Sequence, residues 1–170
     1  FNDIFNAVSD YYIKAEHYVP VTKLQRISFA LGLHFNQSDF DQDSIINRPF
    51  KNDRNTSFRI TSYLKDRFNL GQYFSIEPGL KVDLSIAKAV RPFIQPRVNL
   101  FIKPHPMLRF KLAWGLYNQY IVEYAFIDNL DNRLFFWDVP DNRAKNPLRS
   151  MHTVAAFSFG KKHINVKVEA

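Results

Sequence analysis

Apolar residues alternate strictly with polar, charged or glycine residues from Phe74 to Ile86. Every even position in this stretch is apolar, and every odd position carries Ser, Glu, Gly, Lys or Asp. Because successive side chains of a β-strand point to opposite faces, this period predicts a strand with one apolar face and one polar face. A helix, with 3.6 residues per turn, would not separate the same residues into two faces.

The same alternation returns in the two segments that follow. It runs through 97–103, where Phe101 is the exception, and through 108–117. Three consecutive strands are therefore predicted to share one apolar side. A less regular alternation predicts further strands at Ser9–Tyr18, Leu24–Phe35, Ser57–Phe68, Thr153–Phe159 and Ile164–Val168.

The connections between these strands differ in length. Short turns are expected at 19–22, 69–73, 103–107 and 160–163, an intermediate connection at 87–95, and long polar loops at 36–56 and 120–150. Tight turns at one end and long loops at the other are typical of outer-membrane β-barrels, and a run of about a dozen residues suits a tilted membrane-spanning strand. A soluble β-sandwich also shows alternation, so both architectures remain open at this point.

Composition narrows the class of protein. The chain has 170 residues, of which 46% are hydrophobic and 16% aromatic, so it has ample apolar material for an ordered fold. The net charge is +7, but Lys and Arg are spread mostly singly, which does not favour nucleic-acid binding. There is no Cys, no initiator Met, no secretory signal and no run of about 18 apolar residues, so we expect a mature or excised piece without membrane-spanning helices.

No catalytic, metal or cofactor site is expected. The five His residues are scattered and do not have a metal-ligand spacing. Glu77 and Asp83 share a strand face, but at about 3.3 Å per residue they lie about 20 Å apart, too far to act on one bond. The sequence contains no phosphate-binding glycine loop, nucleophile elbow or local Ser-His-Asp signature.

Two groups of residues are candidates for ligand contact. Aromatic residues cluster at and beyond the end of the strand at 108–117, either as an interfacial girdle or as a ligand-binding patch at the mouth of a barrel; the patch would comprise Tyr117, Tyr120, Tyr124 and Trp137. Basic residues lie on the polar side of the predicted strands and would face a lumen, where they contact an inner domain or an anionic cargo; they include Lys81, Arg97, Arg109 and Lys111.

Four segments follow one another along the chain: Ser62–Arg67, Phe74–Asp83, Pro96–Leu100 and Leu108–Gln119. In succession they resemble the barrel of TonB-dependent outer-membrane receptors, particularly those of the Bacteroidota. The second is similar to the family's Leu-x-Pro-Gly-Leu-Arg-x-Asp strand, the third to its Pro-Arg strand and the fourth to its Ala-Tyr-Gly-x-Tyr strand. Ile76, Lys81 and Trp114 depart from these patterns but keep their chemical character.

The resemblance extends from about Leu24 to the end of the chain. It implies that residues 1–170 are part of an antiparallel transmembrane β-barrel of 22 strands in the bacterial outer membrane, without the plug domain. The implied activity is TonB-energised uptake of a nutrient such as a metal chelate, glycan or peptide. The implied partners are membrane lipid, TonB through the plug, the transported ligand and a surface lipoprotein. A porin-like barrel and a soluble β-sandwich binding module are the alternatives.

Two further expectations concern the shape of the sheet. We expect about seven or eight strands in an open, curved sheet, because an eight-stranded closed barrel would crowd about seven Lys and Arg into a narrow lumen with only Glu77, Asp83 and Glu169 to offset them. We also expect one set of side chains to share the outer surface, comprising Phe29, Leu31, Leu33, Ile76, Leu80, Val82, Leu84, Leu100, Phe110, Leu112 and Trp114.

Overall fold

A computed structural model describes residues 4–42, 53–87, 89–127, 131, 133–141, 146–161 and 164–170. The fold is all-β. No helix in these ranges is long and apolar enough to cross a membrane. The strands are β1 (Ile4–Pro20), β2 (Gln25–Gln42), β3 (Asp53–Leu70), β4 (Phe74–Ile86), β5 (Val90–His105), β6 (Leu108–Gln119), β7 (Val122–Ile127), β8 (Arg133–Asp138), β9 (Leu148–Lys161) and β10 (Ile164–Glu169).

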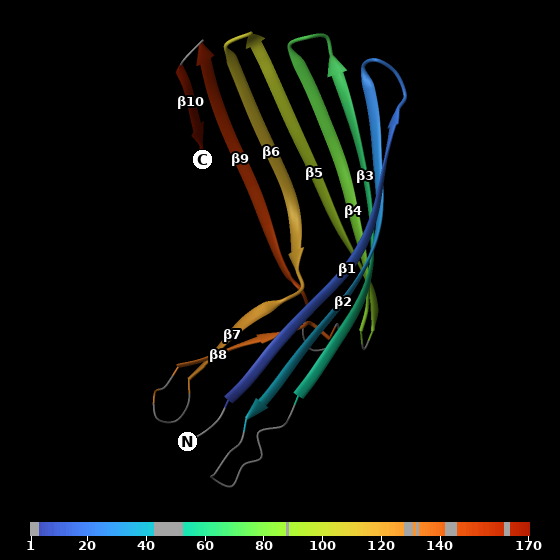
Figure 1. Cartoon of the computed structure of the whole chain (residues 1–170), viewed down its shortest axis with the longest axis vertical. Helices are drawn as coiled ribbons and strands as arrows, with labels where there is room; N and C mark the ends of the chain where they lie inside the picture. The colour runs from blue at the N-terminus through green and yellow to red at the C-terminus, as the bar shows by residue number, and fades with distance from the viewer. Residues whose placement is uncertain are drawn as a thin grey trace.

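Eight of these strands form one antiparallel sheet in the order β1-β2-β3-β4-β5-β6-β9-β10. The sheet is curved, and β1 and β10 lie at its two edges (Figure 1). Within the described residues, β1 and β10 do not pair with each other. The expectation of an open sheet of seven or eight strands is therefore confirmed. Strands β7 and β8 form a separate hairpin between β6 and β9 in the chain.

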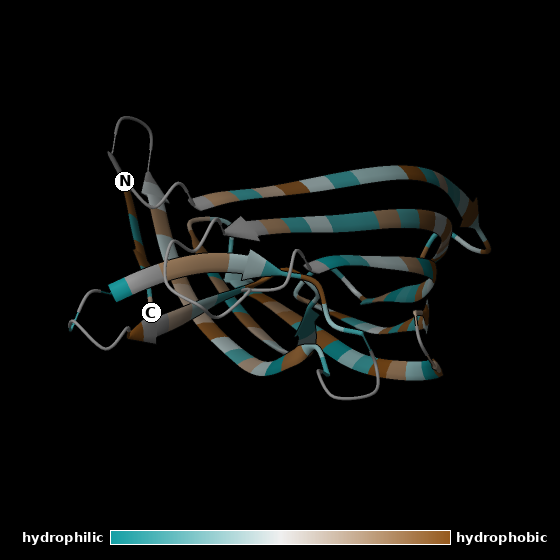
Figure 2. Cartoon of the chain, turned by 90° about the horizontal axis from the view of Figure 1, so that it is seen from below, coloured by the Kyte–Doolittle hydropathy of each residue, from teal (hydrophilic) through white to brown (hydrophobic). Residues whose placement is uncertain are grey.

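The register between strands places the predicted outer residues on one face. Leu31, Leu80 and Leu112 are 59%, 43% and 48% exposed. Cross-strand pairs such as Ile76 with Leu100 and Leu100 with Leu112 continue the same apolar face from strand to strand. Figure 2 shows the resulting alternation of hydrophobic and hydrophilic residues along the strands. All eleven residues expected on this face share it, and no second sheet within the described residues packs against them.

The opposite, polar face is the concave one, and it contains most of the buried side chains. The curvature crowds side chains on this face, so small and polar residues become inaccessible there. Phe101, the exception to the alternation, pairs with Lys111 on this face. The buried polar residues of the face include Ser28, Asn36, Ser38, Asn55, Ser57, Arg59, Thr61, Glu77, Asp83, Ser85 and Gln95.

The expected polar loop at 36–56 is wrong in extent. Strand β2 continues to Gln42, β3 begins at Asp53, and the two strands pair as far as Phe40 with Asp53. Alternation is lost here because polar residues occupy both faces, whereas the backbone hydrogen-bond ladder continues. Asp43, which we expected in this loop, lies outside the described residues.

Two other expected connections are also corrected. The connection at 87–95 is much shorter, because β5 begins at Val90 and pairs with Ile86. The expected loop at 120–150 contains the β7–β8 hairpin, and β9 already begins at Leu148. Asn132, which falls in that expected loop, lies outside the described residues.

The tight turns lie together at one end of the sheet. The β1–β2, β3–β4 and β5–β6 turns and the paired ends of β9 and β10 are at the top of Figure 1, and the β7–β8 hairpin is at the opposite end. Gly71 in the β3–β4 turn has a φ of 71°, a conformation that glycine adopts without steric cost. We call these the turn end and the loop end of the sheet.

Candidate functional site

The middle of the concave face is organised around the carboxylate of Asp83, which is fully buried. Thr61 Oγ1 donates a hydrogen bond of 2.8 Å to Asp83 Oδ1, and Gln95 Nε2 donates one of 2.5 Å to Oδ2. Lys81 Nζ lies 3.1 Å from the same Oδ2. A buried carboxylate requires such donors, because an unpaired charge in this position would be costly.

A second acidic group, Glu77, organises the part of the face closer to the turn end. Arg67 Nε donates to Glu77 Oε2 over 2.6 Å, and Asn99 Nδ2 donates to Oε1 over 3.3 Å. Lys65 Nζ lies 3.6 Å from Oε1. Glu77 therefore pairs with basic residues of the neighbouring strand β3, whereas Asp83 pairs with Lys81 of its own strand and accepts hydrogen bonds from β3 and β5.

Two arginines of the concave face are stacked on tyrosine rings. The guanidinium carbon of Arg59 lies 3.7 Å from the centre of the Tyr120 ring, and that of Arg97 lies 4.2 Å from the centre of the Tyr117 ring. Such cation–π contacts hold a guanidinium in place without neutralising its charge. Among the described residues, Nε and Nη1 of Arg59 and Nε of Arg97 have no hydrogen-bond partner.

Tyr120 lies just beyond β6 and is buried. Burial raises the pKa of its phenol above the ordinary value, and the nearby Asp83 carboxylate adds to this effect. The phenol therefore stays neutral, and its ring can cover the charged Arg59.

A hollow of about 310 Å³ opens on the concave face beside these groups. Small residues of β2 make room for this hollow. His34, Tyr63 and Arg97 are among the side chains that line it. His34 stacks on Tyr12 with 5.6 Å between the ring centres, and its Nδ1 has no hydrogen-bond partner among the described residues. The hollow thus presents basic and aromatic groups together, which suits an anionic or aromatic ligand.

At the loop end, residues 133–140 fold inward over the concave face; we call this segment the strap. Asp138 Oδ1 accepts hydrogen bonds of 3.0 Å from both Ser38 Oγ and Asn55 Nδ2. The side chain of Asn6 donates to the Trp137 carbonyl over 3.1 Å and accepts from the Trp137 amide over 2.7 Å. Val139 is fully buried. The strap is thereby attached to β1, β2 and β3.

The predicted aromatic patch is brought together only in part. Tyr117 and Tyr120 cover arginines of the concave face, so they do not lie on the apolar face where an interfacial girdle would be. Tyr124 stacks on Phe136 within the β7–β8 hairpin, with 5.6 Å between ring centres. Trp137 is 43% exposed on the strap. Whether these residues contact a ligand remains a prediction.

The four predicted basic residues divide into two places. Lys81 and Arg97 lie beside Asp83 and the hollow, whereas Arg109 and Lys111 line a separate pocket at the turn end. Sequence reasoning missed Gln95, Asn6 and Asp138. Gln95 fell in an expected connection, and no local pattern indicates that Asp138 would meet Ser38 and Asn55.

Among the described residues, no three His, Asp or Glu side chains come close enough to hold a metal ion.

A curved antiparallel sheet with an apolar convex face, a polar concave face and tight turns at one end has the fold of a section of an outer-membrane β-barrel wall. The fold is similar to that of the siderophore receptor PirA from Pseudomonas aeruginosa, with a TM-score of 0.64 and 12% sequence identity. The similarity covers 96% of this chain and 31% of that receptor, so the chain spans about a third of the receptor's length. No protein-family model matches the sequence, and neither does any curated protein.

Proposed function

We propose that this chain is a section of the barrel of a TonB-dependent outer-membrane receptor, which imports a nutrient such as a metal chelate, a glycan or a peptide. The observation that carries the proposal is the pairing of an exposed apolar convex face with a charged concave face on one open sheet. Lipid would cover the first face, and the second would line the lumen. The similarity to a siderophore receptor supports the same class of protein.

The concave face supports transport rather than catalysis. Its two buried acids are engaged in ion pairs and hydrogen bonds. Basic residues such as Lys81 and Arg97 line the 310 Å³ hollow and no acidic residue lines it, which favours a cargo that carries negative charge. Partners in this proposal are outer-membrane lipid, TonB acting through a plug domain, the cargo and a surface lipoprotein. The Bacteroidota assignment rests on the four sequence motifs alone.

Uptake by the bacterium that carries the complete gene tests the proposal. Radiolabelled probes of three classes would be offered: a ferric chelate, an oligosaccharide and a peptide. We expect gene-dependent uptake of one class, and we expect it to stop when a protonophore collapses the proton-motive force. Uptake that continues under the protonophore would identify a porin-like barrel. Recovery of the protein outside the outer-membrane fraction would refute both readings.

A further inference from the structure

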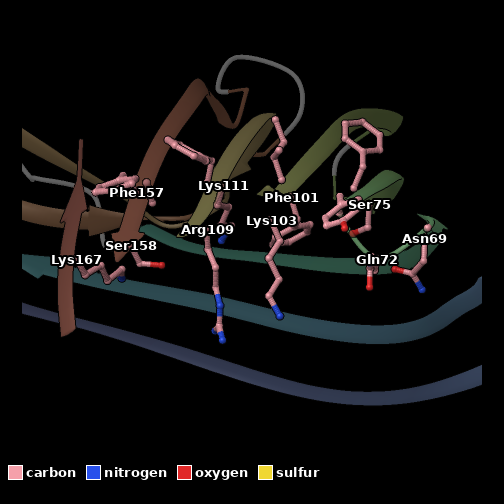
Figure 3. Close-up of a pocket in the computed structure, with 16 residues that line it drawn as sticks. Asn69, Gln72, Ser75, Phe101, Lys103, Arg109, Lys111, Phe157, Ser158 and Lys167 are labelled. Carbon is pink, nitrogen blue, oxygen red and sulfur yellow. The ribbon is translucent and has the colours of Figure 1, made fainter. Parts of the chain in front are cut away.

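A pocket of about 410 Å³ lies at the turn end, away from the strap. Four basic residues from three strands are among those that line it, namely Lys103 of β5, Arg109 and Lys111 of β6, and Lys167 of β10. Figure 3 shows Lys103 and Arg109 extending from the sheet on the same side. None of the residues that line the pocket is acidic.

The positive charge at this pocket is not matched by acidic residues of the pocket. Elsewhere on the concave face, Glu77 pairs with Lys65 and Arg67, and Asp83 pairs with Lys81. In the part of the chain that the structure describes, Lys103, Arg109 and Lys111 form no ion pair. Lys167 does pair with Glu169, at 2.6 Å, but both side chains are more than half exposed and the pair is weak.

The cations are spread in a way that fits several separate anionic groups. Arg109 and Lys111 are two residues apart on β6, about 7 Å along the strand. Arg109 pairs with Ser158, which pairs with Lys167, so these two cations lie two strands apart, about 10 Å, with a small hydroxyl between them. A single phosphate would require donors that converge on one point. Alternate residues of an extended peptide are also about 7 Å apart.

The base of the pocket contributes an apolar surface. The ring of Phe101 lies close to two cations, with Lys111 Nζ 5.9 Å and Arg67 Cζ 5.4 Å from its centre. Ser75 pairs with Phe101 in the neighbouring strand and adds a hydroxyl. A partner therefore meets charge, hydroxyl groups and an aromatic ring together, which favours a polypeptide over a small inorganic anion.

We propose that this pocket binds an extended polypeptide segment with Asp or Glu at alternate positions. The acidic side chains pair with Arg109, Lys111 and Lys167, and the segment passes over Ser158 and Phe101. This proposal goes beyond the transport function, since it names a protein partner at the turn end and does not depend on any cargo.

Photo-crosslinking in the intact protein tests this. Ser158 would be replaced by benzoylphenylalanine in the complete gene, cells would be irradiated, and the attached peptide would be mapped by mass spectrometry. We expect a segment with at least two Asp or Glu at alternate positions. We expect the double variant Arg109→Gln, Lys111→Gln to lower the cross-link yield at least about tenfold. Lys23→Gln, which removes a cation from another turn at the same end, should leave the yield unchanged.

Three results would overturn the proposal: attachment to a segment without acidic residues, no attachment to any polypeptide, or equal yields in the double variant and its parent. Mobility on gels with and without heating would show that every variant is folded, and a second benzoylphenylalanine at Ser75 would confirm a negative result. Nutrient uptake, measured separately, would show whether the transport proposal fails independently of this one.

Discussion

Gly115 illustrates how one residue on the concave face makes room for the groups around it. It pairs with Arg97 across β5 and β6. A Cβ atom added at Gly115 would lie 3.0 Å from Arg97 Cγ and 3.0 Å from Tyr117 Cε2. Since real Cβ contacts are almost never closer, the absence of a side chain at Gly115 is what allows the arginine to stack on the tyrosine.

We expect Gly115→Ala to destabilise the protein by about 1–3 kcal/mol, because the new methyl group must displace Arg97 or Tyr117. Gly32→Ala is the matched control, since its nearest neighbour would be an ordinary contact at 3.5 Å. This change should be neutral or stabilise by about 0.5–1 kcal/mol, because alanine loses less backbone entropy on folding. Urea unfolding of both variants measures the difference. Equal losses in the two variants would contradict this account of Gly115.

Leu80, at the middle of β4, tests the apolar face. If lipid covers this face, Leu80→Arg should lower the free energy of unfolding in bilayers by about 2–4 kcal/mol, as expected near the bilayer midplane. Leu24→Arg, in the β1–β2 turn, should cost only about 0–1 kcal/mol. Equal costs at the two positions would show that lipid does not contact Leu80.

At this scale, sequence patterns locate residues on faces but do not identify their partners. Alternation placed Lys81, Asp83 and Arg97 on the polar side of their strands, and the structure confirms this. The bonds of Asp83 to Thr61 and Gln95 depend on the register between three strands. No pattern within one strand contains that information.

The strap is the element that covers the concave face at the loop end. Its attachment depends on Asn6. The Asn6 side chain forms hydrogen bonds with both the N–H and the C=O of Trp137, as a neighbouring strand would. Such a contact satisfies two backbone groups at once, so its loss leaves both without a partner.

We expect Asn6→Ala to release the strap. The loss of two hydrogen bonds should raise the open population about tenfold, and trypsin cleavage after Arg133 should accelerate to the same extent. Gln72→Ala, in the exposed β3–β4 turn, serves as the control and should leave cleavage unchanged. An unchanged rate in Asn6→Ala would mean that Asp138 alone holds the strap.

Strands were predictable from the sequence where the two faces of the sheet have different surroundings. This is why the strand at Phe74–Ile86 was predicted. The end of β2 after Phe35 and the beginning of β3 up to Thr56 were missed, because polar residues there occupy both faces. The start of β5 was also missed; it contains Pro92, and proline cannot donate a hydrogen bond to a strand ladder. The β7–β8 hairpin has aromatic residues on both sides and no periodicity.

For the molecule as a whole, the two ends of the sheet should face different compartments. The chain has no cysteine, so a single introduced cysteine reports one position. In intact cells, a membrane-impermeant maleimide should label Arg133→Cys at the loop end and not Gln72→Cys at the turn end. Gln72 is preferable to Gly71, whose positive φ disfavours other residues. Labelling of Gln72→Cys alone would show that the orientation is the opposite of the one expected.

The order of the strands also has a consequence for how the sheet assembles. From β1 to β6, each strand pairs with the one just before it in the chain, so contacts are local and hairpins can be added one at a time. Strand β9 instead pairs with β6, and the β7–β8 hairpin separates these two strands in the chain. Closing the longer loop between β6 and β9 costs additional conformational entropy. During folding, the outer edge of β6 should therefore stay without a strand partner for longer than the edge of any earlier strand. Shortening the excursion between Gln119 and Leu148 should therefore speed the last stage of folding more than any change in the first six strands.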